Sequence, residues 1–177
     1  MPYGILIETL KPIDKNTSRN KLGLNQEDKL VLFCSKFSRE GKNAPLAFSA
    51  VGLLDDVKLL ELTGNYTKEE MNYLFNAVDV CLMTSISEGS PQFIKEAMAC
   101  NCPIVSVNVG DVKEVIAHTE GCYVSDTYKK EEIAEKIKMA LQFGKRTTGR
   151  ERIFEMGLDT KSVSEKLMQI YNQAVNR

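Results

Sequence analysis

The stretch Asp79-Val-Cys-Leu-Met-Thr-Ser85, followed shortly by Glu88-Gly-Ser-Pro-Gln-Phe-Ile-Lys-Glu96-Ala-Met-Ala-Cys100, decides the fold. The first part is a short apolar run of strand length. The second part has small polar residues and a proline at the place where a helix would begin. The order is therefore strand, loop and helix. In open α/β sheets such a loop lies at the carboxyl end of a strand, where these sheets bind ligands.

The same alternation continues along the chain. Apolar runs of strand length cover residues 29–34, 57–62, 79–83, 103–107 and 121–124. Helical patterns separate them, at roughly residues 45–54, 68–78, 91–100, 112–117 and 130–143. This order predicts a doubly wound, Rossmann-like α/β domain, with a parallel sheet of about five to six strands and helices on both faces.

Two terminal segments lie outside this alternation. Residues 1–25 are polar and irregular, whereas residues 160–177 form a helical pattern with one apolar face. Neither segment has the length or composition of a separate domain, so we expect a single domain over residues 1–177. Within it, Thr67-Lys-Glu-Glu70 is a capping-box sequence that predicts a helix start at Lys68.

The composition limits the classes of partner. The chain has 177 residues, of which 43% are hydrophobic, so it can bury a substantial core. A formal net charge of −1 argues against a nucleic-acid partner, because such partners are usually met with a basic excess. The sequence contains no apolar run long enough to span a bilayer and no signal-peptide pattern. We therefore expect a cytoplasmic location.

The five cysteines indicate a reducing environment. Most of them lie in or beside apolar runs, which is typical of reduced, buried thiols in a cytosolic protein. Cys100 and Cys102 have one residue between them, where a metal or redox pair usually has two, and His118 is the only histidine. The sequence therefore predicts no metal site.

Glu88 and Glu96 are the candidate ligand-binding residues in the loop and helix that follow residue 83. A helix start offers free backbone N–H groups and the positive end of its dipole to a phosphate. The two carboxylates would repel that phosphate, so they are better suited to accept hydrogen bonds from sugar or ribose hydroxyls beside it. The spacing alone leaves a second interpretation open, in which Glu96 is a solvated helix residue and Glu88 complements the dipole.

The chain resembles the C-terminal, nucleotide-sugar-binding half of group-1 retaining glycosyltransferases of the two-domain GT-B fold, the glycogen-synthase-like class. The most specific match is residues 88–103, which resemble the family signature Glu-Gly-x₆-Glu-Ala-Met-Ala-x₃-Pro. Four shorter segments match in the same order: Pro2-Tyr-Gly-Ile5, Ser18-Arg-Asn-Lys-Leu-Gly-Leu24, Asn76-Ala-Val-Asp79 and Val109-Gly-Asp-Val-Lys-Glu114.

The resemblance implies a role for each matching residue. Glu96 would bind the ribose hydroxyls, and Glu88 would contact the transferred sugar. The remaining donor-binding positions that it implies around the diphosphate are Gly89, Ser90, Pro91, Gln92 and Phe93. The turn over residues 62–66 would hold the base, with Asn65 and Tyr66 as the candidates.

The family also places a basic pair after the first strand, to neutralise the leaving diphosphate. Lys36 and Lys42 are the candidates, and Arg39 is an alternative to either. The sequence departs from the family here, because Ser35-Lys36 replaces Gly-Arg and Lys42-Asn43 replaces Lys-Gly. Lysine keeps the charge but lacks the bidentate fork of arginine. Asp111 is a further departure, at a position where relatives usually have glycine.

The implied activity is transfer of a sugar, with retention, from a nucleotide diphosphate to an acceptor hydroxyl of a cell-surface polysaccharide, another glycan or a lipid-linked sugar. No cofactor or metal is implied. We expect a fragment that lacks the N-terminal acceptor domain and has little activity alone, from an enzyme that is cytoplasmic or peripheral at the membrane. Residues 1–25 would derive from the interdomain linker. Residues 160–177 would be a crossover helix whose bare apolar face favours self-association.

Two other functions remain open at this point. One is a non-catalytic module that binds a nucleotide sugar for regulation, since the fold does not dictate the function. The other is a sugar-nucleotide epimerase with the same two-domain architecture, although the Glu-Ala-Met-Ala run matches the transferases better.

Overall fold

The computed structural model describes residues 3–175, so Met1 and Pro2 of the expected linker, and Asn176 and Arg177 of the expected terminal helix, lie outside the described residues. Its centre is a five-stranded parallel sheet in the order β2-β1-β3-β4-β5. The strands are β1 (Lys29–Phe33), β2 (Val57–Glu61), β3 (Val80–Met83), β4 (Ile104–Val107) and β5 (Cys122–Ser125). The five predicted strands are confirmed, each within a residue of its expected bounds.

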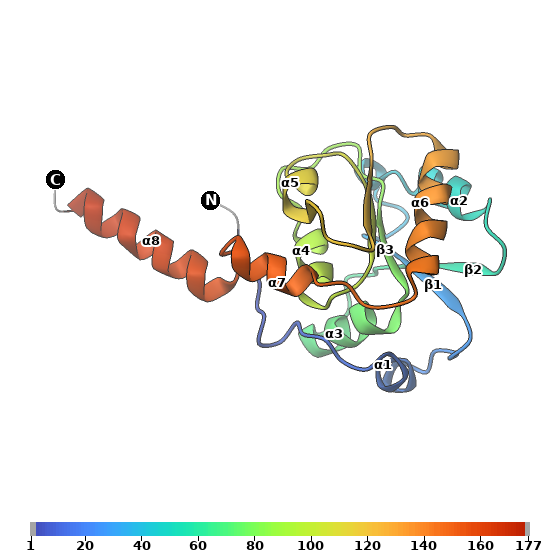
Figure 1. Ribbon diagram of the computed structural model, residues 1–177, viewed down its shortest axis with the longest axis horizontal. Helices are drawn as coiled ribbons and strands as arrows, with labels where there is room; N and C mark the ends of the chain where they lie inside the picture. The colour runs from blue at the N-terminus through green and yellow to red at the C-terminus, as the bar shows by residue number, and fades with distance from the viewer. Residues whose placement is uncertain (1–2, 176–177) are drawn as a thin grey trace.

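Helices cover both faces of the sheet, as the doubly wound prediction requires (Figure 1). On one face lie α2 (Ala44–Val51) and α6 (Lys130–Phe143). On the other lie α3 (Lys68–Ala77), α4 (Gln92–Ala99) and α5 (Val112–Ile116), with α7 (Gly149–Glu155) packed against α4 and α5. After β1 the chain moves to β2 on one side of it, and after β3 it moves to β4 on the other side of the sheet. Right-handed crossovers therefore place the connecting helices on opposite faces.

The core follows from the apolar character of the central strands. All the residues of β3 and β4 are buried, and in β1 only Lys29 is exposed. Strands that are covered on both faces have nearly continuous apolar sequences, which explains the short runs seen in this chain. The edge strands β2 and β5 are only partly buried. The capping box at the start of α3 is also confirmed, with the Thr67 and Glu70 side chains bonded reciprocally to backbone N–H groups.

The N-terminal segment is not irregular as predicted, because it contains the helix α1 (Lys15–Leu22). This helix has no apolar stripe, so hydrophobic periodicity could not reveal it. It is held instead by Arg19, which is fully buried and donates hydrogen bonds to the Ala77 carbonyl (2.8 Å) and to Asp79 Oδ2 (3.0 Å). Asp14 caps its first turn, and Gly23 ends it in the left-handed conformation. The single-turn helix η1 (Glu40–Lys42) and α7 were not predicted either.

The final helix, α8 (Thr160–Val175), extends away from the rest of the molecule (Figure 1). None of its residues is buried. Its exposed large apolar side chains are Leu167, Met168, Ile170, Tyr171 and Val175. Among residues 3–175, no helix combines the length and the hydrophobicity needed to cross a bilayer.

Candidate functional site

The predicted ligand-binding residues gather where the strand order reverses. The loops after β1 and β3 flank this point at the carboxyl edge of the sheet, which is the usual ligand position in open α/β folds. Hydrogen bonds to backbone carbonyls tie the loops together. The Ile86 N–H donates to the Gly41 carbonyl at 3.0 Å, and Thr84 Oγ1 donates to the Asn43 carbonyl at 2.9 Å. The two loops therefore form one wall of the site.

Lys42 and Glu88 form an ion pair across this point. Their side chains are 17% and 16% exposed, so both remain accessible to a ligand while most of each is shielded from water. Lys36 is exposed and has no ion-pair partner among residues 3–175. Of the two predicted basic residues, the structure therefore brings Lys42 directly against a predicted carboxylate, and it leaves Lys36 at the surface.

The start of α4 offers backbone donors, as expected of an anion-binding helix. Pro91 is the N-cap residue and Gln92 the first helical one, a position later than predicted. No side chain caps this end, so the first-turn N–H groups have no side-chain acceptor. The Phe93 side chain is buried, with its ring centroid 5.7 Å from that of Phe75, so only its backbone is available to a ligand. Gln92 Nε2 donates to the Tyr3 carbonyl at 3.4 Å.

Glu96 and Tyr66 lie on the same cavity, of about 160 Å³. Its other lining residues are Gly4, Ile5, Leu6, Thr9, Leu10, Lys68, Met71 and Gln92. Burial raises the pKa of Glu96 above the ordinary glutamate value. Glu96 is thus a half-buried residue on this cavity rather than a fully exposed one. Asn65, one residue before Tyr66, is exposed.

Three charged or polar side chains beneath the site form a cluster that the sequence analysis missed. Lys95 is fully buried, donates a hydrogen bond to Ser90 Oγ and lies 3.4 Å from Asp111 Oδ2, and Ser90 Oγ donates to the same carboxylate. A signal was present in the sequence, because Lys95 shares its helix face with Met98 and Ala99, both of which are core residues. A lysine on such a face predicts a buried counter-charge.

Cys34 follows the last residue of β1 and is buried close to the site. Burial raises the pKa of Cys34 to about 11, although Lys42 and a contact with Ser85 Oγ (3.9 Å) act in the opposite direction. At neutral pH this thiol is protonated, so it is not a nucleophile. The chemistry of the site therefore rests on carboxylates, lysines and backbone N–H groups.

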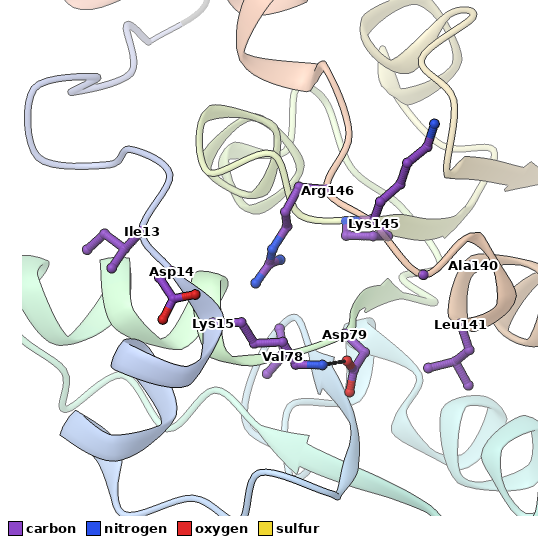
Figure 2. Close-up of a pocket in the computed structure, with 11 residues that line it drawn as sticks. Ile13, Asp14, Lys15, Val78, Asp79, Ala140, Leu141, Lys145 and Arg146 are labelled. Carbon is purple, nitrogen blue, oxygen red and sulfur yellow. Dashed lines mark hydrogen bonds and ion pairs between the residues drawn. The ribbon is translucent and has the colours of Figure 1, made fainter.

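A second hollow, of about 450 Å³, lies at the opposite edge of the sheet (Figure 2). It is lined by residues that precede β3 and β4 and by the end of α6. Three of its charged side chains, Lys15, Asp79 and Arg146, hold the fold together. Lys15 pairs with Asp79, and Arg146 donates to the Phe75 and Asn76 carbonyls at the end of α3. This hollow therefore has a structural explanation.

One family model matches most of the chain. A model described as "Glycosyl transferases group 1" matches residues 26–142. D-inositol 3-phosphate glycosyltransferase of Mycobacteroides abscessus is 21% identical over 204 aligned positions, covering 97% of this chain and 45% of the relative. The chain thus spans about half the length of that relative.

Solved structures share the fold. Sucrose-phosphate synthase of Thermosynechococcus elongatus has a TM-score of 0.87 at 19% identity, over 99% of this chain and 52% of the other. The Anabaena protein HepE, solved in complex with UDP-glucose, has a TM-score of 0.75 at 18% identity, over 96% and 56%. At these identities the similarity establishes the architecture of the domain.

Proposed function

The chain belongs to the group 1 glycosyl transferases, and from this premise we propose that it supplies the nucleotide-sugar donor site of a retaining sugar transfer. The observation that carries the proposal is the convergence of Glu88, Lys42 and the uncapped start of α4 at the point where the strand order reverses. That arrangement provides an anion site flanked by a carboxylate that can accept hydrogen bonds from sugar hydroxyls.

Each part of the donor has a partner in this arrangement. The diphosphate lies at the backbone N–H groups of Gly89, Ser90, Gln92 and Phe93, with Lys42 offsetting the charge that grows as the glycosidic bond breaks. Glu88, freed from Lys42, accepts hydrogen bonds from the sugar. The ribose lies at Glu96, and the base lies beside Tyr66 on the same cavity. Lys36 is an additional, exposed source of positive charge. The transfer needs no metal and no cofactor.

The acceptor belongs to the part of the enzyme that corresponds to the other half of the relatives. We propose a glycan or a lipid-linked sugar as the acceptor, in keeping with polysaccharide synthesis at the cytoplasmic side of a membrane. The exposed apolar face of α8 supports self-association of the chain when no other surface covers it. On its own, the chain binds the donor and transfers little sugar.

Calorimetric titration with UDP, GDP and ADP tests the donor site. We expect saturable binding of one nucleotide, and a loss in affinity of about tenfold or more in Glu96→Ala, which removes the hydrogen bonds to the ribose. Glu135→Ala is the matched control, because Glu135 is an exposed glutamate on α6, on the opposite face of the sheet. Equal affinity in Glu96→Ala and the native protein would contradict the assignment of Glu96. Absence of binding by all three nucleotides would contradict a self-sufficient donor site.

A further inference from the structure

Among residues 3–175, Lys95 is the only lysine that is fully buried. Its ammonium group has polar contacts with two side chains, Ser90 Oγ and, at 3.4 Å, Asp111 Oδ2. Removing an ammonium ion from water costs several kcal/mol unless a counter-charge and hydrogen bonds replace the water. The fold therefore holds this charge in place through Asp111, which comes from a different loop.

The hydrogen bonds of the cluster have a fixed direction. Lys95 donates to the Ser90 oxygen, and Ser90 donates its own hydrogen to Asp111 Oδ2. The Ser90 hydroxyl therefore has no hydrogen left for a phosphate. The loop over residues 88–91 can then offer an anion only its backbone N–H groups, and the cluster fixes where these groups point.

The two loops that carry the cluster are also packed backbone to backbone. The Asp111 N–H donates to the Gly89 carbonyl at 3.1 Å. Gly110 has a φ of +55°, and a Cβ atom there would lie 2.2 Å from the same carbonyl oxygen. The other carboxylate oxygen, Asp111 Oδ1, is buried without a hydrogen-bond partner. The polar contacts of this carboxylate with Ser90 and Lys95 are therefore made through Oδ2 alone. A buried oxygen without a partner lowers the stability of the fold, and the contacts that hold the loop offset that cost.

We propose that Lys95 and Asp111 form a charged clamp that fixes the 88–91 loop in its donor-binding conformation. Lys95 is then a positioning residue, which acts on the ligand through Ser90 and the loop backbone. The inference rests on the proposed donor site, but its effect on the loop exists in the free protein as well.

Hydrogen exchange of the backbone amides of residues 88–93, measured without ligand, tests the clamp directly. We expect Lys95→Met to speed this exchange about tenfold or more, because the loop opens locally once Asp111 loses its counter-charge. Asp111→Asn should have a similar effect. The double variant, Lys95→Met with Asp111→Asn, should recover at least half of the lost protection, because it leaves no unpaired buried charge.

Titration of the same variants with UDP, GDP and ADP gives the second measurement. We expect each single variant to bind the preferred nucleotide about tenfold more weakly, and the double variant to regain part of that affinity. Lys136→Met is the control, because Lys136 forms an ion pair of 3.6 Å with Glu132 on α6, and it should alter neither measurement. A purely structural role would lower the melting temperature and leave loop exchange relative to the core unchanged.

Two results would overturn the clamp. One is unaltered loop exchange in both single variants, and the other is additive losses in the double variant, which would mean that the two charges act independently. A failure of the donor-site proposal is distinguishable from these results. In that case no nucleotide binds the native protein, while the loop exchange of the variants still follows the pattern described.

Discussion

At the scale of single residues, the site combines groups that are individually costly to the fold. Glu96 is half-buried on a cavity where burial disfavours its charged form, and its carboxylate has no hydrogen-bond or ion-pair partner among residues 3–175. A side chain that only served stability would not be an uncompensated glutamate. Such a cost is expected where a carboxylate is kept for a ligand, since functional sites often reduce stability.

The stability cost of Glu96 should depend on pH. Its pKa is raised in the folded protein, so the folded state holds this proton more tightly than the unfolded chain does. The contribution of Glu96 to stability therefore falls as pH rises through the ordinary value of 4.5 towards the raised pKa. Glu96→Gln cannot titrate, so it should gain stability relative to the native protein between about pH 4 and pH 7, by on the order of 1 kcal/mol or less.

Urea unfolding of both proteins across that pH range gives the measurement. Glu135→Gln, on the exposed face of α6, is the matched control and should show no such trend. If the difference between Glu96→Gln and the native protein stayed flat or shrank with rising pH, burial would not govern this carboxyl. The same variant should still lose affinity for the nucleotide, because glutamine is a weaker acceptor for ribose hydroxyls than a carboxylate.

At the scale of the elements, α1 shows that a helix can be anchored by charge rather than by an apolar stripe. Arg19 satisfies the Ala77 carbonyl at the end of α3 and pairs with Asp79, whose Oδ2 also accepts the Leu30 N–H at 2.7 Å. One buried arginine thus links α1, α3 and the strands β1 and β3.

Arg19→Met should destabilise the fold by about 3–5 kcal/mol. It removes one of the two cations paired with Asp79, and it leaves the Ala77, Asn25 and Gln26 carbonyls without their side-chain donor. Lys21 is an exposed residue on the same helix, so the control substitution Lys21→Met should change the free energy of unfolding by no more than about 0.5 kcal/mol. Chemical denaturation of the three proteins measures the difference. A loss below about 1 kcal/mol in Arg19→Met would mean that packing alone holds α1 in place.

At the scale of the whole molecule, stability is expected to be uneven. The sheet and its covering helices share one core, whereas α8 has no buried residue and extends beyond it (Figure 1). A 16-residue helix with no buried residue is marginal in water. The first turn of α8 is tied to the body by the Thr160 N–H, which donates to the Ile5 carbonyl at 3.0 Å.

We expect α8 to open without unfolding the rest of the molecule. At low protein concentration its amides should exchange at least about 100-fold faster than those of α4, whose opening requires the core to separate. Hydrogen exchange followed by mass spectrometry measures both helices in one experiment, with α6 as a second reference of similar length. Protection of α8 equal to that of α4 at low concentration would contradict this expectation, and protection that rises with concentration would support self-association through its apolar face.

Local signals explain how much could be predicted. The five strands, the helices that cover them and the capping box at Thr67 follow from apolar periodicity and capping chemistry, which act over a few neighbouring residues. Glu88 and Glu96 could be named because they lie in the loop and the helix that follow a strand in the sequence. Lys42 could be named only because the resemblance to the glycosyltransferases implies a basic pair after the first strand. In contrast, α1, α7 and η1 were missed, since α1 has no apolar stripe and the other two are short.

The alternating α/β order, the parallel sheet and the placing of the candidate site at a strand end could all be predicted from the sequence, because each depends on patterns within one element. Only the tertiary structure decided which residues meet. Lys42 reaches Glu88, Tyr66 joins Glu96 on one cavity, Arg19 reaches Asp79, and Lys95 is matched by Asp111. These pairs come from segments far apart in the chain, and their energies depend on burial and counter-charge, which exist only once the segments have packed together.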